Sequence, residues 1–276
     1  MNQHNKIIII IVLYKTLAEE SRSYKYYTKY KHLLDCEHQL IIFNNSPEIT
    51  ITNIQDAIII NSTENKKLNT AYNFALKYAN ENIANWLLLL DSDSKLTEDY
   101  FIELSNTLNS KIDNNIVSIV PTLIQNNKTI SPHRHQFMYL RCNPTNKQGV
   151  INGKIIAFNS LSLLRVSFLN EINGFSPKFP LDMLDYWVYS QIEKKRKSVL
   201  LLESKIEHDL SVTNFEENMT LNRYKDLILS EKKFFRELGL GYQIAYRLKL
   251  LLRSMKQFIV FKNKEFSKIT LNQMFK

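Results

Sequence analysis

The sequence predicts an α/β domain with a mixed, mostly parallel β-sheet flanked by helices, followed by a helical C-terminal extension. Short apolar runs such as Ile7–Leu13 and Trp86–Leu90 alternate with helical patterns through the first half of the chain. Such runs are typical of strands covered on both faces, and their alternation with helices implies parallel pairing. Apolar residues make up 44% of the 276 residues, which is enough for a sizeable core.

The expected elements follow one another in a regular order. The expected strands are Ile7–Leu13, Gln39–Phe43, Ala57–Ile60, Trp86–Leu90, Ile116–Val120 and Val199–Leu202. The expected helices are residues 16–35, Leu68–Ala79, a helix with Thr97 as its N-cap, Asn159–Ile172 and Leu184–Lys194. Residues 125–150 are polar and without a pattern, so we expect a long loop there. The chain is helical in pattern from residue 216, with a break at Gly239–Gly241, which predicts a main domain of residues 1–215 and an extension of residues 216–276.

Composition bounds the setting of the protein. Cys36 and Cys142 are too few and too far apart for a metal cage or a disulfide framework, so a reducing compartment is the default. The run Ile7–Leu13 lacks the flanks of a signal peptide. No apolar run approaches the roughly 20 residues that a membrane span requires. We therefore expect a cytoplasmic protein.

The net charge of +9 lies entirely in the tail. From Arg223 to Lys276 there are 13 Lys or Arg against 4 Asp or Glu, and the preceding residues are balanced. Seven apolar residues of this tail recur at helical spacing: Ile244, Leu248, Leu251, Leu252, Met255, Phe258 and Ile259. Three basic residues fall on the other side of the same helix: Lys249, Arg253 and Lys256.

Two interpretations of this helix remain open. Residues 242–262 can lie on an anionic membrane, which would attach the protein peripherally to the inner face of the membrane. Alternatively, the apolar face docks on the main domain and the lysines are solvated. We expect no nucleic-acid partner, because the sequence contains no known binding module.

The strongest local signal for chemistry is the pair Asp91 and Asp93. The pair directly follows the apolar strand Trp86–Leu90. At the end of a strand, carboxylates two residues apart can converge on one point, and hard oxygen ligands suit Mg²⁺ or Mn²⁺. A metal there can bind the two phosphates of a nucleotide sugar. The alternative is a pair of turn or capping residues before the helix at Thr97.

A second group of polar residues follows about 90 positions later. Asp182 and Asp185 stand three apart at the start of an expected helix, where Asp185 can act as a general base and Asp182 can cap the helix. His208 follows the last expected strand and is a potential metal ligand, although a lone histidine is more often structural.

Several segments between about Ile7 and Ser211 resemble the family-2 glycosyltransferases with the Rossmann-like GT-A fold, especially the rhamnosyltransferase-like members. They are IIIIIVLYK, IIFNNS, NSTENKKLNTAYNFALKYA, WLLLLDSDS, NSLSLLRVSFLNEINGFSPKFPLDMLDYW and KIEHDLS. The order and spacing of these segments carry the resemblance. Five positions depart from the family pattern: Asn44 and Trp187 each replace an acid, Lys67 and Leu161 each replace a glycine, and Gln191 replaces an arginine.

The resemblance implies a role for each matching residue. Asp185 would be the catalytic base, and Asp91, Asp93 and His208 would hold Mn²⁺ or Mg²⁺. The acceptor side would include Ser160, Asp182 and Trp187. The residues implied for donor binding are Tyr14, Asn44, Asn45, Ser46, Asn65, Asn73, Asp91 and Ser92.

The expected function is that of an inverting glycosyltransferase. It would move a sugar from a nucleotide-diphosphate donor, with UDP- and dTDP-sugars favoured, to a hydroxyl of a glycan or lipid-linked acceptor. Bacterial surface polysaccharide synthesis is the expected setting. Two alternatives remain: a catalytically degenerate domain of the same fold that binds glycan or a partner, and a haloacid-dehalogenase-type phosphatase.

Overall fold

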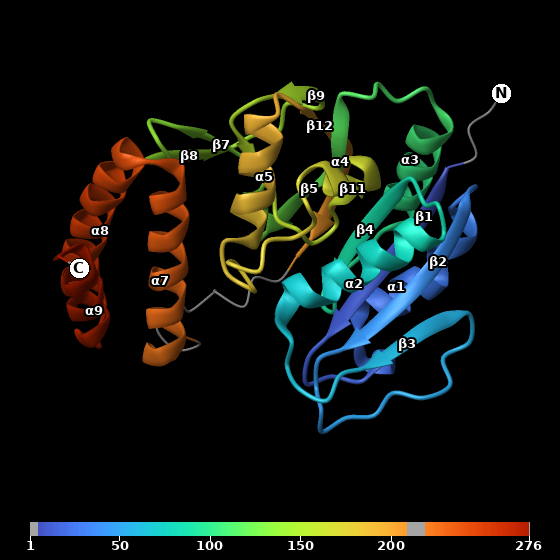
Figure 1. Ribbon diagram of the computed structural model, residues 1–276, viewed down its shortest axis with the longest axis horizontal. Helices are drawn as coiled ribbons and strands as arrows, with labels where there is room; N and C mark the ends of the chain where they lie inside the picture. Colours follow the sequence, from blue (N-terminus) through green and yellow to red (C-terminus); the bar gives the residue numbers. More distant parts are fainter. Residues whose placement is uncertain (1–4, 209–218, 276) are drawn as a thin grey trace. The chain divides into compact units, whose positions relative to one another are not determined.

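The computed structural model describes residues 5–208 and 219–275, which form two compact units (Figure 1). The first, the sheet unit, comprises residues 5–133 and 144–208. The second, the helical unit, comprises residues 134–143 and 219–275. The predicted boundary between residues 215 and 216 lies outside the described residues. The fold class predicted from the sequence is confirmed: a mixed, mostly parallel sheet flanked by helices, with a helical C-terminal part.

A sheet of nine strands forms the centre of the sheet unit. Its order is β3-β2-β1-β4-β11-β5-β12-β9, and β6 pairs with β5. The pairs β1–β2, β2–β3, β1–β4 and β5–β12 are parallel, whereas β11 runs antiparallel between β4 and β5. The bounds are β1 Lys6–Leu13, β2 Glu37–Asn44, β3 Ala57–Asn61, β4 Trp86–Asp91, β5 Ile116–Gln125, β6 Lys128–Ser131, β9 Gly149–Asn152, β11 Leu163–Arg165 and β12 Ser198–Glu207.

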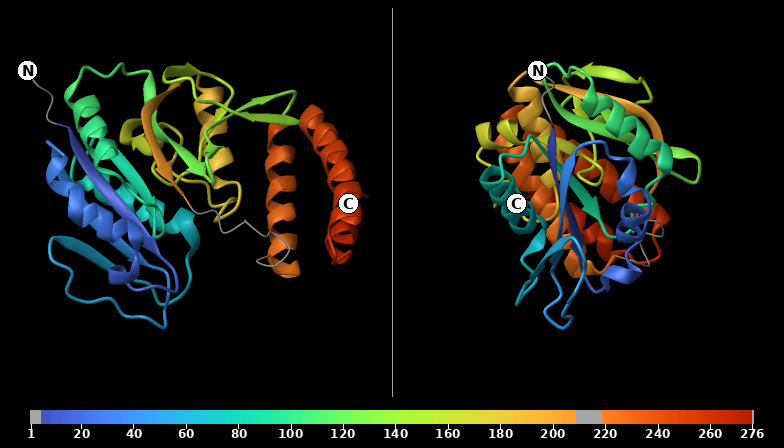
Figure 2. Two further views of the ribbon diagram at one scale, coloured as in Figure 1. Left: turned by 180° about the vertical axis from the view of Figure 1, so that it is seen from behind. Right: turned by 90° about the vertical axis from the view of Figure 1, so that its right-hand side faces the viewer.

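Helices cover both faces of the sheet. The bounds of the longer helices are α1 Arg22–Tyr30, α2 Lys67–Glu81, α3 Glu98–Asn109, α4 Val166–Glu171 and α5 Leu184–Lys194, and the 3₁₀ helices are η1 Ala18–Glu20 and η2 Lys31–Leu33. The helix α2 lies over one face (Figure 1), and α1 and α3 lie over the other, as the view from behind shows (Figure 2). Both faces of the central strands are therefore buried, which explains their continuous apolar runs.

Alternation along β4 decides which side chains face which helices. Trp86, Leu88 and Leu90 belong to the core that includes Tyr100 and Phe101 of α3. Side chains alternate between the two faces of a strand, so the odd-numbered positions of β4 face α2 instead. The carboxylate of Asp91, the last residue of β4, is thereby directed to the α2 side.

Two expectations about strands and helices are wrong. Residues 125–150, expected to be a loop, contain strands. The sequence pattern did not reveal them because half-exposed hairpin strands lack the apolar runs of buried ones. The turn between β5 and β6 is Asn126–Asn127, with φ values of 49° and 60°, which suits a two-residue hairpin. The expected helix Asn159–Ile172 is in fact the strand β11 followed by the short helix α4, because Leu163 and Leu164 pair with the strands on both sides.

Two other local expectations are confirmed. The hydroxyl of Thr97 accepts a hydrogen bond from the Tyr100 backbone N–H at 3.3 Å, which caps α3. The helix Leu184–Lys194 has the predicted bounds. The predicted cap at Asp182 is wrong, because Met183 occupies the N-cap position with φ 63° and makes no side-chain capping hydrogen bond.

The helical unit consists of a hairpin and three helices. The bounds are β7 His133–Gln136, β8 Arg141–Pro144, α7 Leu221–Leu238, α8 Leu240–Val260 and α9 Glu265–Phe275, and the short strand β10 Ile155–Ile156 lies within the sheet unit. Gly239, with φ 115°, separates α7 from α8 at the predicted break. Among the described helices, none is long and apolar enough to cross a membrane.

Candidate functional site

Polar side chains meet at one edge of the sheet. Asp91 ends β4 and His208 directly follows β12, and these strands run in the same direction, so both residues lie at the carboxyl edge. Ser160 reaches the same edge because β11 is antiparallel and the chain enters it there: the Leu161 N–H donates to the Leu89 carbonyl oxygen at 2.8 Å. The topology thus gathers residues that are more than a hundred positions apart.

Asp91, Asp93 and His208 form the only cluster of three potential metal ligands found among residues 5–208 and 219–275. One ligand atom from each side chain lies within 4.8 Å of the others. The Oδ1 atom of Asp93 is buried and has no hydrogen-bond partner among the described residues. Buried polar oxygens are normally satisfied, so an unpaired carboxylate oxygen here fits a cation. Two carboxylates and one imidazole suit Mn²⁺ or Mg²⁺ in chemistry, which makes the residues present compatible with such an ion.

A short chain of hydroxyl groups orients the imidazole. The Oγ atom of Ser94 lies 3.3 Å from Nδ1 of His208 and 2.9 Å from Oγ of Ser160. The Ser94 N–H in turn donates to Oγ of Ser23 at 3.1 Å. A hydrogen bond at Nδ1 fixes the ring and leaves Nε2 available, which is the usual support of a histidine that binds metal. Sequence reasoning did not assign any role to Ser94.

Burial and neighbouring charges shift the pKa of Asp91. Burial raises it most, and the nearby Asp93 carboxylate raises it further, to about 6. His208 and the hydroxyl groups of Ser160 and Tyr72 lower it, but by less. A buried acid whose pKa is raised by a neighbouring carboxylate is a natural site for a divalent cation, because the cation removes the repulsion between the two groups.

Asp185 lies at the start of α5, close enough to Asp91 to interact with it electrostatically. Burial raises the pKa of Asp185 to about 6, Asp182 and Asp91 add to this rise, and a hydrogen bond at 2.8 Å from the Tyr186 N–H opposes it. A carboxylate whose pKa is raised toward neutrality is well matched to general-base work. The structure therefore brings Asp185 into the neighbourhood of the metal-ligand cluster.

Tyr72 is a site residue that sequence reasoning placed only on the buried face of a helix. It lies on α2, its side chain is fully buried, and its hydroxyl has no hydrogen bond of normal geometry within the described chain. Burial and the charges of Asp91 and Asp185 raise its pKa well above the ordinary value. A neutral phenol thus lies near both carboxylates and can donate a hydrogen bond to either.

Two residues predicted to bind the donor are used internally. The amide of Asn44 donates to the Ile49 carbonyl oxygen at 2.5 Å, and its Oδ1 atom accepts from the Ser46 N–H at 2.9 Å. Oγ of Ser46 accepts from the Lys15 N–H at 2.5 Å. Both side chains are fully buried. Their hydrogen bonds shape the turn after β2.

The segment before α2 is held in a similar way. Oδ1 of Asn45 accepts from the Lys66 N–H at 3.1 Å, and Oδ1 of Asn65 accepts from the Lys67 N–H at 3.0 Å. Lys67 and Leu161, the two residues that replace family glycines, both have a φ of 64°. The backbone at these positions keeps the left-handed conformation that glycine adopts most easily.

Asn73 links α2 to the loop before α5. Its amide donates to the Phe175 carbonyl oxygen, and its Oδ1 atom accepts from the Phe175 N–H, each at 2.8 Å. A Cβ added at Gly174 would lie 2.5 Å from Oδ1 of Asn73, so this position requires glycine. Asn73 therefore positions the loop that leads to Asp185.

The remaining predicted residues lie around the same edge. Tyr14 follows β1 and is half exposed, with the Lys15 ammonium 5.3 Å from its ring. The Ser92 carbonyl oxygen accepts a hydrogen bond from the Ser21 hydroxyl at 2.8 Å. Asp182 and Trp187 are partly buried at the start of α5.

Comparisons with known proteins agree with this fold. Residues 38–172 match the family model described as glycosyl transferase family 2, a range that includes Asp91 and Asp93 but ends before Asp185 and His208. No curated protein sequence matches.

Two solved structures resemble the chain in fold. GalNAc-T7 with UDP, GalNAc and Mn²⁺ has a TM-score of 0.60 at 11% identity, covering 99% of this chain and 56% of the other. TarS 1–349 from S. aureus in complex with UDP-GlcNAc has a TM-score of 0.51 at 10% identity, covering 98% and 71%. The family match and the GT-A fold together support a glycosyltransferase.

Proposed function

We propose that this protein is an inverting, metal-dependent glycosyltransferase that uses a nucleotide-sugar donor. The observation that carries the proposal is the meeting of Asp91, Asp93 and His208 within 4.8 Å at the carboxyl edge of the sheet. The electrostatic proximity of Asp185 to this cluster supports it further. When bound at these three side chains, Mn²⁺ or Mg²⁺ would offset the negative charge of the leaving nucleoside diphosphate.

Asp185 is the proposed base in a single displacement. Its carboxylate takes the proton of the acceptor hydroxyl, whose oxygen forms a bond to the anomeric carbon of the donor sugar. The bond between that carbon and the diphosphate oxygen breaks at the same time, and the nucleoside diphosphate leaves with the electron pair. Attack from the side opposite the leaving group inverts the anomeric configuration.

The other residues of the site have supporting roles in this proposal. Ser94 holds the His208 imidazole by its Nδ1 atom, and Asn73 fixes the loop that carries Asp185. Tyr72 can donate a hydrogen bond to the carboxylate of Asp91 or Asp185. On the donor side we propose contacts from the exposed ring of Tyr14 and from the residues around Ser92. Trp187, Ser160 and Asp182 are proposed for the acceptor side.

The donor and acceptor classes are also proposals. UDP- and dTDP-sugars are the favoured donors, and the GalNAc-T7 and TarS structures carry UDP or UDP-GlcNAc. The acceptor would be a hydroxyl of a glycan or of a lipid-linked saccharide. The proposed setting is bacterial surface polysaccharide synthesis in the cytoplasm, with hexose or rhamnose as the transferred sugar.

A thermal-shift panel tests the proposal. The full chain is melted with UDP-, dTDP- and GDP-sugars, each with and without Mn²⁺. A ligand at 100 times its Kd adds about 2.7 kcal/mol to the stability, so one class of donor should raise Tm clearly, and only when Mn²⁺ is present. The variant Asp93→Asn should lose this metal-dependent rise while keeping the Tm of the protein alone.

Slow donor hydrolysis provides a second readout. Release of the nucleoside diphosphate from the stabilising donor separates an active enzyme from a degenerate binding domain. Stabilisation without any release or transfer would favour the binding domain. Hydrolysis of a simple phosphate ester without a sugar nucleotide would favour the phosphatase instead.

A further inference from the structure

The helix α8 turns its apolar side outward. Within the helical unit, α8 packs against α7 and α9 through its other side. Eight large apolar side chains on one side of α8 are between 37% and 77% exposed: Leu240, Ile244, Leu248, Leu251, Leu252, Met255, Phe258 and Ile259. At 3.6 residues per turn these eight positions fall within an arc of ~120°. We call this set the apolar face of α8.

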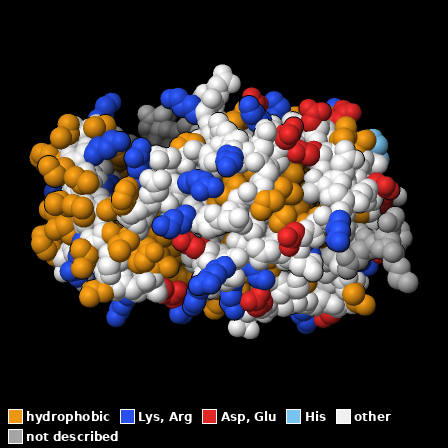
Figure 3. Space-filling model, turned by 90° about the horizontal axis from the view of Figure 1, so that it is seen from above, with side chains coloured by type: hydrophobic (Ala, Val, Ile, Leu, Met, Phe, Trp, Pro, Cys, Tyr) orange, Lys and Arg blue, Asp and Glu red, His pale blue; other side chains and the backbone are white. Residues whose placement is uncertain are grey.

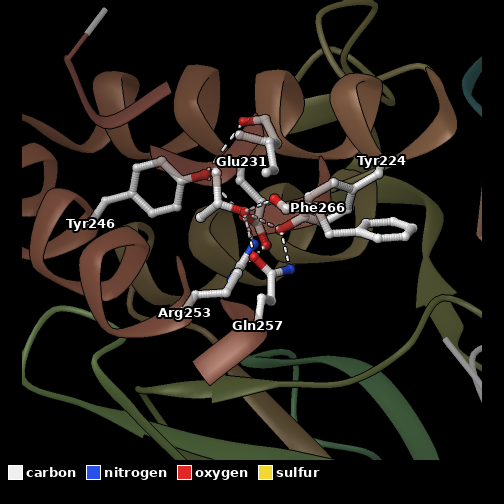
Figure 4. A network of polar contacts seen from close by, with 8 residues as sticks. Tyr224, Glu231, Tyr246, Arg253, Gln257 and Phe266 are labelled. Carbon is white, nitrogen blue, oxygen red and sulfur yellow. Dashed lines mark hydrogen bonds and ion pairs between the residues drawn. The ribbon is translucent and has the colours of Figure 1, made fainter. Parts of the chain in front are cut away.

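The packed side of α8 is largely polar. The residues buried there are Ala245, Tyr246, Leu250, Ser254 and Gln257. Figure 4 shows Tyr246, Arg253 and Gln257 directed toward side chains of neighbouring helices. Nε2 of Gln257 donates to the Tyr224 hydroxyl at 2.7 Å, and the Arg253 guanidinium donates two hydrogen bonds to Glu231 at 2.7 and 3.0 Å.

These contacts fix the orientation of the helix. A rotation that buried the apolar face would expose Leu250 and break the polar contacts, leaving a carboxylate and an amide without partners. Hydrophobic side chains accordingly gather over the C-terminal helices, at the left of Figure 3. An exposed apolar area of this extent marks an interaction surface.

Charge identifies the partner. The sequence of α8 contains four basic residues and no acidic residue. Arg253 is paired with Glu231, and the Lys249 ammonium lies 5.9 Å from the Phe235 ring of α7. The other two basic residues border the apolar face, Arg247 along one edge and Lys256 along the other. Long basic side chains at the edges of an apolar face can reach phosphate groups while the apolar residues enter the acyl region.

A second copy of the chain fits this surface less well. In a symmetric dimer the same patch meets itself, so the basic edges of the two helices would face each other. An anionic bilayer supplies the opposite charge and an apolar layer at the same time. The helix has 21 residues and is therefore about 31 Å long, enough to lie along a membrane surface as one rigid rod.

We propose that α8 is a monotopic membrane-binding helix that lies flat on an anionic lipid surface, with its apolar face in the bilayer and its basic edges at the phosphates. The inference stands on the helical unit alone and does not depend on the proposed transfer reaction. It would place the chain at a surface where lipid-linked substrates are present.

Co-sedimentation with vesicles tests the inference. The full chain is mixed with vesicles of phosphatidylcholine alone, or of phosphatidylcholine and phosphatidylglycerol at roughly 2:1, without donor or metal. Binding to the anionic vesicles should be at least roughly tenfold tighter than to the neutral ones, and it should weaken with salt. The variant Arg247→Gln/Lys256→Gln should remove most of this difference.

A matched pair of variants tests the apolar part. Leu252→Ser/Ile259→Ser should lower the affinity for anionic vesicles roughly tenfold, because both side chains would enter the bilayer. The control Ile83→Ser/Val150→Ser changes two exposed apolar residues of the sheet unit, 87% and 55% exposed, and should leave binding unchanged. Circular dichroism of each variant checks that it remains folded.

Two results would overturn the inference. One is the absence of binding to anionic vesicles, or equal losses in the test and control variants. The other is a dimer, detected by sedimentation equilibrium without lipid, that Leu252→Ser/Ile259→Ser dissociates while vesicle binding stays unchanged. Loss of transfer activity alone has no bearing on this test, since the assay contains no substrate.

Discussion

The two units of this protein place apolar residues in opposite ways. In the sheet unit, Ile9 and Leu88 are fully buried within strands, and the polar residues of the site lie at the strand ends. In α8, Leu252 and Ile259 are 58% and 77% exposed, while Gln257 is buried. The comparison teaches that apolar spacing predicts a helix with two different faces, but not which of them the protein covers.

Specific polar contacts account for the difference. The Thr270 hydroxyl donates to Oε1 of Gln257 at 2.6 Å, and Oγ of Ser254 lies 3.0 Å from Oγ of Ser267. These bonds join α8 to α9, as the Gln257–Tyr224 bond joins it to α7. Satisfied buried polar groups specify one arrangement, because any other leaves them without partners.

Among the variants of the two units, Asp185→Asn in the sheet unit should have the largest effect. The amide cannot accept the acceptor proton, so transfer should fall about 10²–10⁴-fold while donor affinity stays close to that of the wild type. Transfer and donor binding are measured separately, by product formation and by thermal shift. Retained transfer would show that another group is the base.

The pH dependence sharpens the same prediction. Burial raises the pKa of Asp185 to about 6, so the wild-type rate should fall as the pH drops through this value, or through a lower one when a divalent cation is bound nearby. The pKa of Asp185 in the folded protein exceeds its ordinary value of 3.8. Ionisation of this carboxyl therefore destabilises the fold as the pH rises from about 4 to above 6. Asp185→Asn should therefore raise Tm near neutral pH, and this gain should vanish toward pH 4. A gain that is equal at all pH values would contradict the assignment.

Arg253→Met tests the polar side of α8. It removes the charged partner of Glu231, whose side chain is 14% exposed and also accepts a hydrogen bond from the Tyr246 hydroxyl at 2.9 Å, and should cost about 2–3 kcal/mol of unfolding free energy. Urea denaturation provides the measurement. A loss below about 0.5 kcal/mol would mean that the ion pair does not hold the helix.

Lys67→Gly should stabilise the sheet unit slightly. Lys67 is exposed and has a left-handed backbone, which costs a non-glycine residue about 1 kcal/mol. The control Lys77→Gly lies in the interior of α2 and should instead cost about 1 kcal/mol. The unfolding free energy is measured for both variants. A change of the same sign in both would contradict the conformational argument.

The smallest effect is expected for Leu252→Ser in solution. The side chain is 58% exposed in the helical unit, so its removal should change the unfolding free energy by less than about 0.5 kcal/mol. A loss above about 2 kcal/mol in the monomer would show that the residue is buried in solution. This variant also serves as the control for Arg253→Met, because it lies on the same helix.

The sequence predicted those parts of the structure that depend on local patterns. The apolar strand before Asp91, the cap at Thr97 and the bounds of α5 followed from burial, hydrogen bonding and helical spacing. Two of the expectations that failed, the loop at residues 125–150 and the helix at Asn159–Ile172, concerned strands whose formation depends on distant partners. Local propensity cannot report such pairing.

The candidate site divides in the same way. Asp91 and Asp93 stood out because a buried strand ends in two acids. Tyr72 did not, because a buried tyrosine on a helix has the same pattern as any core residue, and only the fold places its hydroxyl near two carboxylates. The internal hydrogen bonds of Asn44 were also beyond reach, since they depend on the path of the turn after β2.

Binding of Mn²⁺ to the free protein tests the central claim most directly. Electron paramagnetic resonance counts free Mn²⁺ in a titration of the wild type, Asp93→Asn, His208→Gln and the control Asp99→Asn, an exposed acid of α3. The account predicts one ion per chain for the wild type and the control, and an affinity at least roughly tenfold lower for the other two variants. Equal affinity in all four proteins would contradict it.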